Sequence, residues 1–283
     1  MGWFTRSGCR VLALLLCAVV CSAGPAAADT AKDFVDLELV LAVDVSMSMD
    51  LDEQRLQRDG YVAAFRDPRL HSAIKDGPNG RIAVSYVEWS GGHMQALVVP
   101  WRIIASAQDA QKFADTLAER PISRAFFTSI SGAVAASHSL FASSPARGLR
   151  RVIDVSGDGP NNSGSPVEAA RDRIVAAGAV INGLAIQLAD RTGPYTYFDL
   201  PDLDRYYRDC VIGGPGAFVL TIRNKREFAS AIRKKLLLEV AGRTPSGMVR
   251  VWRAQAQSNP DKYDCLIGEK MWQQYQRNRG NWP

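Results

Sequence analysis

Short apolar runs alternate along this chain with segments in which apolar residues recur every third or fourth position. The run at 37–45, broken by Glu38, is typical of a strand that is buried on both faces of a sheet. Residues 81–89 and 93–101 flank the turn Ser90-Gly91-Gly92 and are expected to pair as a hairpin. Further strands are expected at 150–155, 180–186 and 217–222.

Helical periodicity occupies the spaces between these strands. It predicts helices at 51–66, 107–118 and 129–142, and a closing helix from Lys225 onward. Strands that alternate with helices favour parallel pairing through right-handed crossovers. We therefore expect an α/β fold, a three-layer α/β/α sandwich with a mostly parallel central sheet and one antiparallel edge strand. In such sheets, ligands bind beyond the carboxyl ends of the strands.

One more helix, just before the strand at 180–186, has clear signals at both ends. Ser165 fits its N-cap and Pro166 its first helical position. Glu168 completes a capping box with Ser165. Gly178 suits the left-handed residue that commonly follows the last turn of a helix.

The amino-terminal segment is predicted to be a signal peptide, residues 1–28. It combines basic residues at Arg6 and Arg10 with an apolar run and a cleavage site after Ala28. The apolar run is shorter than the roughly 20 residues that span a bilayer, so we expect no transmembrane segment in the mature chain. A lipid-modified cysteine, Cys17 or Cys21, is the alternative. The protein is therefore expected to be exported, either to the periplasm or outside the cell.

The mature chain is expected to form one domain at 29–242, with an insertion at 188–215, followed by a tail at 243–283. Its two cysteines are Cys210 in the insertion and Cys265 in the tail. An oxidising compartment favours a disulfide between them that tethers the tail, with two separately buried thiols as the alternative.

The overall charge says little about partners. The formal net charge is +5, and removing Arg6 and Arg10 with the signal leaves 5 − 2 = +3. A weakly basic surface favours no particular class of ligand. The basic and aromatic residues of the tail are too few for a nucleic-acid footprint, so no nucleic-acid partner is expected.

Oxygen-bearing side chains follow the first buried strand. Asp44, Ser46 and Ser48 alternate along the chain, and as the strand becomes a loop their oxygens can converge on one point. A carboxylate and two hydroxyls suit Mg²⁺, which prefers octahedral oxygen ligands. The alternative is that Asp44 or Ser48 only caps the helix at 51–66.

Two other residues belong on the same rim of the sheet. Thr128 lies where a loop enters the helix at 129–142, and Asp158 lies just past the carboxyl end of the strand at 150–155. Each has a structural alternative, since Thr128 could cap its helix and Asp158 could form a turn with Gly159. Their placement beside the loop after the first strand favours a shared metal site.

Together, Asp44-x-Ser46-x-Ser48, Thr128 and Asp158 resemble the metal-ion-dependent adhesion site of von Willebrand factor A domains. The resemblance covers residues 35–240 and includes the order of strands and helices. The segments 155–164 and 181–186 resemble an exported bacterial family of this fold whose function is undescribed.

The resemblance implies that the hydroxyls of Ser46, Ser48 and Thr128 bind a divalent cation directly. Asp44 and Asp158 would act mainly through bound water. It further implies one open position for an Asp or Glu of a protein partner. Mg²⁺ is the expected cation, and Mn²⁺ and Ca²⁺ are alternatives.

The sequence departs from the family pattern after the strand at 150–155. It has Ser-Gly-Asp-Gly around Asp158 where Thr-Asp-Gly is usual, which implies a shifted or widened loop. Asn161 and Asn162 follow, and their side-chain amides are candidates for contact with the metal rim or the ligand.

These features predict an exported, metal-dependent, adhesion-type binding module and not an enzyme. A phosphatase of the haloacid dehalogenase type needs a second acid where Ser46 stands. Neither a Gly-x-Ser-x-Gly nucleophile elbow nor a Gly-Lys-Ser/Thr phosphate-binding loop occurs. The remaining alternative is a structural scaffold of a cell-envelope complex, with a structural metal.

Overall fold

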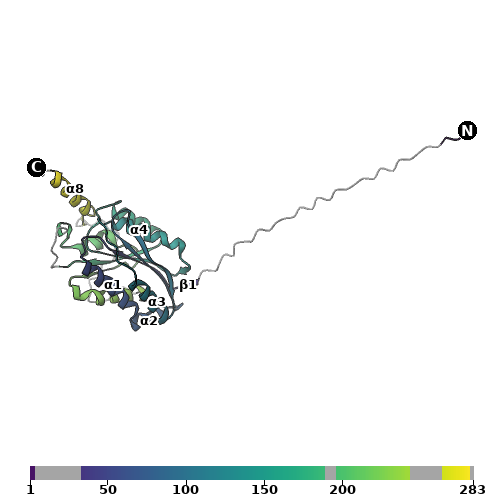
Figure 1. Ribbon diagram of the computed structural model, residues 1–283, viewed down its shortest axis with the longest axis horizontal. Coiled ribbons are helices and arrows are strands. Elements are labelled where there is room, and N and C mark those ends of the chain that lie inside the picture. The colour runs from purple at the N-terminus through teal and green to yellow at the C-terminus, as the bar shows by residue number, and fades with distance from the viewer. Residues whose placement is uncertain (4–32, 189–195, 243–262, 281–283) are drawn as a thin grey trace. The chain divides into compact units, whose positions relative to one another are not determined.

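The computed structural model describes residues 1–3, 33–188, 196–242 and 263–280, and Figure 1 shows it as a ribbon. Residues 4–28 of the predicted signal peptide, and so its cleavage site, lie outside the described residues. In the described part of the chain, no helix is both long enough and apolar enough to cross a membrane.

A six-stranded sheet forms the centre of the domain, in the spatial order β4-β3-β2-β6-β7-β8. The strands are β2 (Leu37–Asp44), β3 (Ile82–Trp89), β4 (Gln95–Ile104), β6 (Arg151–Gly157), β7 (Val180–Ile186) and β8 (Val219–Ile222). Every neighbouring pair is parallel except β3 and β4, which confirms the predicted sheet with its antiparallel edge strand.

Helices cover both faces of this sheet. One face packs against α1 (Leu51–Phe65), α2 (Pro68–Lys75), α3 (Ala107–Ala118) and α7 (Phe228–Ala241). The other face packs against α4 (Ile130–Leu140) and α5 (Val167–Ala176). Side chains of a strand alternate between faces, so Leu39 and Leu41 of β2 join the first core and Val40 and Ala42 the second. The predicted three-layer sandwich is confirmed.

The residue that caps α1 lies after the predicted metal-site loop. Asp50 is the N-cap: it accepts a hydrogen bond from the Glu53 amide at 2.7 Å, and Glu53 accepts one from the Asp50 amide at 3.0 Å. This capping box satisfies the donors of the first turn. Asp44 and Ser48 are therefore not needed as helix caps.

The predicted start of α5 is wrong by one residue. Pro166, not Ser165, is the N-cap, and it makes no side-chain cap bond. Pro166 has ψ 132°, which is not helical, and the Ser165 carbonyl accepts a hydrogen bond from the Asn161 side chain, so the helix starts after Pro166. At the other end, Gly178 has φ 86°, the left-handed conformation expected after the last turn.

Several short elements are additional to the predicted ones. A small parallel sheet pairs β1 (Asp33–Val35) with β5 (Ala146–Gly148). The insertion contains two 3₁₀ or α-helical turns, η2 (Thr196–Phe198) and α6 (Leu203–Tyr206), and the π-helical turn η3 (Tyr207–Val211). Its residues Tyr206, Tyr207 and Cys210 are buried in the second core.

The described part of the tail is a helix, α8 (Ile267–Gly280), which the polar sequence of the tail did not indicate. Cys265, just before α8, is bonded to Cys210 of η3 with 5.4 Å between their Cα atoms, as predicted. The Tyr263 hydroxyl also donates to the Asp202 carboxylate at 2.7 Å. The tail is thus attached to the insertion by covalent and polar contacts.

A buried charge cluster joins α7 to the sheet. The Lys235 ammonium lies 2.8 Å from the carboxylate of Asp154 on β6 and 2.9 Å from that of Glu239. Glu239 also accepts from the side chain of Asn182 on β7 at 2.7 Å. All three charged side chains are at most 1% exposed, so each charge depends on its partners for stabilisation.

Candidate metal centre

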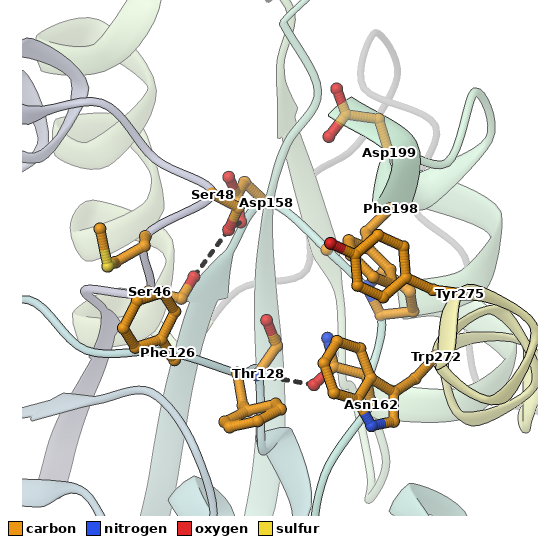
Figure 2. Close-up of a pocket in the computed structure, with 14 residues that line it drawn as sticks. Ser46, Ser48, Phe126, Thr128, Asp158, Asn162, Phe198, Asp199, Trp272 and Tyr275 are labelled. Atoms are coloured by element: carbon orange, nitrogen blue, oxygen red, sulfur yellow. Dashed lines mark hydrogen bonds between the residues drawn. The ribbon is translucent and has the colours of Figure 1, made fainter. Parts of the chain in front are cut away.

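The loop after β2 brings three of the predicted residues together. Asp44 ends β2, and its carboxylate accepts from the Ser46 amide at 2.7 Å. The Ser46 and Ser48 hydroxyls are 2.8 Å apart. The Ser48 hydroxyl donates to the carboxylate of Asp158, which directly follows β6, at 2.8 Å (Figure 2). Neighbouring parallel strands end at one edge of the sheet, and this edge gathers the four oxygen-bearing side chains.

Thr128 reaches the same edge through a network of backbone contacts. The loop before α4 pairs with the loop after β2 in a bridge between Ser46 and Ala125. Asn162 then fixes Thr128 from both sides: its side-chain oxygen accepts from the Thr128 amide at 2.9 Å, and its own amide donates to the Thr128 carbonyl at 2.8 Å. Asn162 thus orients the threonine.

A pocket of about 280 Å³ opens over these residues. Ser46, Ser48, Thr128, Asp158 and Asn162 all line it, and Figure 2 shows their side chains around a common space. Asp44 does not line the pocket. It lies behind Ser46 and is fully buried.

Asn161 does not line the pocket, although its side-chain amide was a candidate for contact with the metal rim or the ligand. Its side-chain oxygen accepts from the Ser131 amide at 3.0 Å. Its side-chain nitrogen donates to the Ser165 carbonyl and to the Glu269 carboxylate of α8, the latter at 2.7 Å. Both polar atoms of the Asn161 side chain are hydrogen-bonded and the side chain is buried. Asn161 therefore connects the first turn of α4 to α8 of the tail.

The electrostatics of the site favour a cation. Burial raises the pKa of the Asp44 carboxyl well above its usual value, and the nearby carboxylate of Asp158 raises it further. Oδ2 of Asp44 has no hydrogen-bond partner among the described residues. None of the described residues that line the pocket is Lys, Arg or His. A bound divalent cation would offset this excess of negative charge.

The donor set fits a hard divalent cation. Within the described ranges, no three His, Cys, Asp or Glu side chains gather as a metal cluster. The grouped donors are instead the hydroxyls of Ser46, Ser48 and Thr128, with carboxylates nearby. Neutral hydroxyls and carboxylates are hard oxygen ligands of the kind that Mg²⁺, Mn²⁺ and Ca²⁺ accept.

Gly157 explains the departure from the usual motif. A Cβ atom at this position would lie 2.8 Å from the Asp44 carboxylate and 2.8 Å from the Tyr207 hydroxyl. Tyr207 belongs to the insertion and is fully buried, so a larger residue at 157 would collide with it. The glycine before Asp158 therefore accommodates the tyrosine of the insertion behind the site.

Aromatic side chains that sequence reasoning did not assign to the site form one wall of the pocket. We call Phe127, Phe198, Trp272 and Tyr275 the aromatic wall. Ring centroids are 5.0 Å apart for Phe127 and Trp272, and 5.5 Å apart for Trp272 and Tyr275. The only indication of this wall in the sequence was the abundance of aromatic residues in the insertion and the tail. Their convergence depends on the placement of α8.

Gly268 allows α8 to approach the site closely. A Cβ atom there would lie 2.1 Å from the Asn161 carbonyl oxygen, a distance that requires the backbone to move. We expect Gly268→Ala to loosen α8 by about 1–3 kcal/mol, the usual cost of overpacking. Hydrogen exchange of the α8 amides measures this, with about tenfold faster exchange expected for each 1.4 kcal/mol.

The exposed position Gln273 on α8 provides the control for this prediction. Gln273→Ala adds no contact at Asn161 and should leave the exchange rates unchanged. Equal protection of α8 in Gly268→Ala and in the unmodified protein would show that this close contact does not determine where α8 lies.

Comparisons with known proteins agree with this architecture. The structure resembles proximal thread matrix protein 1 from the mussel byssus, with a TM-score of 0.53, 14% identity, and coverage of 74% of this chain and 49% of that chain. A second structure of that protein, with a zinc-occupied metal-ion-dependent adhesion motif, gives a TM-score of 0.51 and 14% identity over 74% and 49% of the two chains.

The pilus adhesin SpaC from Lactobacillus rhamnosus GG gives a TM-score of 0.53 at 12% identity, over 74% of this chain and 31% of that one. This chain thus spans about half the length of the mussel protein and about a third of the pilus adhesin. At such identities the likeness shows the fold alone. No curated protein matches the chain in sequence.

A family model matches residues 34–244, which include every predicted metal-site residue. The similar structures are von Willebrand factor A domains, and this confirms the expected fold. The chain has a von Willebrand factor A-like fold, and it belongs to the family described as protein of unknown function DUF1194.

Proposed function

We propose that this protein is an exported binding module that captures an acidic residue of a protein partner through a divalent cation. The observation that carries the proposal is the convergence of Ser46, Ser48, Thr128 and Asp158 on one pocket, backed by the buried Asp44. The proposal assigns the site to binding and not to catalysis.

The chemistry of the donors explains why such a site would attract a carboxylate. Ser46, Ser48 and Thr128 would hold the cation with neutral hydroxyls, and Asp44 and Asp158 would orient its water ligands. When bound, the cation would supply a positive charge that the hydroxyls leave largely uncompensated. An Asp or Glu carboxylate is a hard oxygen ligand of matching charge.

The similar structures support an adhesion-type role at a coarse level. One of them is a pilus adhesin, and another carries zinc in its adhesion motif. We extend to this chain the capacity to bind a divalent cation, with Mg²⁺ as the proposed ion. Export is supported by the Cys210–Cys265 disulfide, because such bonds persist mainly in oxidising compartments.

The proposal is tested with the mature chain and two blocked amino acids, acetyl-aspartate amide and acetyl-asparagine amide. We expect the aspartate compound, in the presence of Mg²⁺, to shift the NMR amide resonances of Ser46, Ser48, Thr128 and Asp158. Affinity should be weak, on the order of millimolar, since one side chain makes the contact. The asparagine compound should cause no shift, because it lacks the charge.

Removal of the metal completes the test. EDTA should abolish the shifts caused by the aspartate compound while the protein stays folded. Shifts that persist in EDTA would rule out capture through a cation. Metal binding without any response to the carboxylate would favour the scaffold with a structural metal.

A further inference from the structure

The pocket has two chemically different sides. Figure 2 shows Ser46, Ser48 and Asp158 on one side and Phe198, Trp272 and Tyr275 on the other, with Thr128 between them. The first side carries hydroxyl and carboxylate oxygens. The second side is the aromatic wall, which comes from the insertion, from α8 and from Phe127 in the loop before α4.

The aromatic side chains are available to a ligand. Phe127 is 44% exposed, and Trp272 and Tyr275 are only partly buried although they contact each other. Phe126, on the opposite side of Thr128 from Trp272, is 58% exposed. Exposed aromatic rings beside a polar site are characteristic of binding surfaces, since they offer large apolar area with little loss of side-chain freedom.

Three contacts outside the pocket hold α8 in place, and with it Trp272 and Tyr275 of the aromatic wall. The disulfide to Cys210 attaches the start of α8, and Glu269 bonds to the buried Asn161. Gly268 packs directly on the Asn161 carbonyl. Asn161 is adjacent to Asn162, which orients Thr128, so the wall is anchored next to the proposed metal ligands.

We infer that the site selects an acidic residue flanked by aromatic residues in its protein partner, an inference that rests on the proposed metal-dependent capture. The carboxylate would meet the cation over Ser46, Ser48 and Thr128. An aromatic neighbour in the partner would then contact the rings of Trp272 and Tyr275. The cation on the oxygen-bearing side would match the charge of the acid and the aromatic wall would match its neighbour, so both are needed for selectivity.

Aromatic neighbours of the acidic residue should raise its affinity, because their ring contacts add binding energy to the single carboxylate contact. Aromatic side chains dominate the binding energy of many interfaces when they enter apolar pockets. Edge-to-face and offset geometries, such as those already present between Phe127, Trp272 and Tyr275, can accept a further ring. Flanking aromatic residues should therefore strengthen binding about tenfold over flanking alanines.

The test uses three blocked tripeptides titrated calorimetrically into the Mg²⁺-loaded mature protein: Phe-Asp-Phe, Ala-Asp-Ala and Phe-Asn-Phe. Phe-Asp-Phe should bind about tenfold more tightly than Ala-Asp-Ala. Phe-Asn-Phe should bind no better than Ala-Asp-Ala, because the aromatic wall alone provides no charge contact. Equal affinity for Phe-Asn-Phe and Phe-Asp-Phe would overturn the inference.

Trp272→Ala isolates the contribution of the wall. It should bring the ratio between Phe-Asp-Phe and Ala-Asp-Ala close to one while Mg²⁺ binding is unchanged, and Trp272→Phe should retain most of the ratio. Phe34→Ala is the matched control, since Phe34 is an exposed aromatic residue on β1, before the amino end of β2. Mg²⁺ binding also reports that each variant is folded.

The outcomes separate this inference from the proposed function. If Phe-Asp-Phe and Ala-Asp-Ala bind equally well in Mg²⁺ and neither binds in EDTA, the selectivity is wrong and carboxylate capture stands. If neither peptide binds to the Mg²⁺-loaded protein, carboxylate capture and the selectivity both fall. A ratio that Trp272→Ala leaves intact would also overturn the role of the wall.

Discussion

Replacing Asp44 or Ser46 with Ala is expected to weaken Mg²⁺ binding by at least about 100-fold, because each change removes an oxygen that holds or orients the ion and its waters. Asp44 provides the buried carboxyl group behind the site, and Ser46 provides a hydroxyl on the pocket surface. Titration calorimetry of Mg²⁺ and Mn²⁺ into the EDTA-stripped mature protein measures the effect. The unmodified protein should bind near one equivalent.

Two exposed residues provide matched controls for this experiment. Asp52→Ala removes a carboxylate from the first turn of α1, and Ser139→Ala removes a hydroxyl from α4, both away from the pocket. Neither should change the titration. One equivalent bound with equal affinity by all four variants would place the metal elsewhere, and no binding to the correctly folded, unmodified protein would refute the metal-dependent function.

Thermal unfolding provides an independent measurement of the same site. A ligand that binds only the folded state stabilises it, by about 2.7 kcal/mol when its concentration is 100 times the dissociation constant. Mg²⁺ should therefore raise the melting temperature of the unmodified protein and of the two controls. It should have little effect on Asp44→Ala and Ser46→Ala.

Lys235→Met is expected to lower the free energy of unfolding by about 3–5 kcal/mol, the usual cost of removing one partner from a buried ion pair. The substitution keeps the apolar length of the side chain but leaves Asp154 and Glu239 buried without their cation. Urea unfolding at neutral pH, followed by circular dichroism, measures the loss. The adjacent residue Lys234 is exposed, so Lys234→Met is the control and should change stability little.

The pH dependence of this loss gives a second check. Burial raises the pKa of Asp154 to about 6, although Lys235 opposes the rise. A carboxyl whose pKa is higher in the folded than in the unfolded state destabilises the protein once it is ionised, and the penalty is relieved as the pH falls through the folded pKa. Lys235→Met removes the interaction that lowers this pKa, so the pKa of Asp154 is higher still in the variant. The deficit should therefore shrink as the pH falls and be small below about pH 6, where Asp154 is protonated in both proteins. A deficit that is equal at pH 5 and pH 8 would argue against an uncompensated Asp154.

Local patterns were sufficient to predict the layers of the fold. The apolar run at 37–45 predicted β2, and the helix predicted at 107–118 is α3 as the structure has it. Such patterns are informative because burial on both faces of a sheet, or on one face of a helix, depends on residues close in sequence. For the same reason, α8 was missed: its polar sequence has no apolar stripe wide enough to signal a helix.

The same distinction applies to the candidate metal site. Asp44, Ser46, Ser48, Thr128 and Asp158 could be placed at one edge from sequence, because parallel strands end together and each residue follows a strand or precedes a helix. Whether Asn161 or Asn162 faces the pocket could not be decided, since adjacent residues in a loop point in directions set by distant partners. Glu269 and Ser131 hold Asn161, while Thr128 holds Asn162.

The sequence by itself therefore determined the class of fold, the edge that carries the proposed metal site and the cysteines available for the tether. Only the tertiary structure decided that α8 lies beside that edge and completes the pocket with Trp272 and Tyr275. It also decided that Gly157 makes room for Tyr207. The physical reason is that these contacts join segments far apart in the chain, and local periodicity carries no information about which distant surfaces will meet.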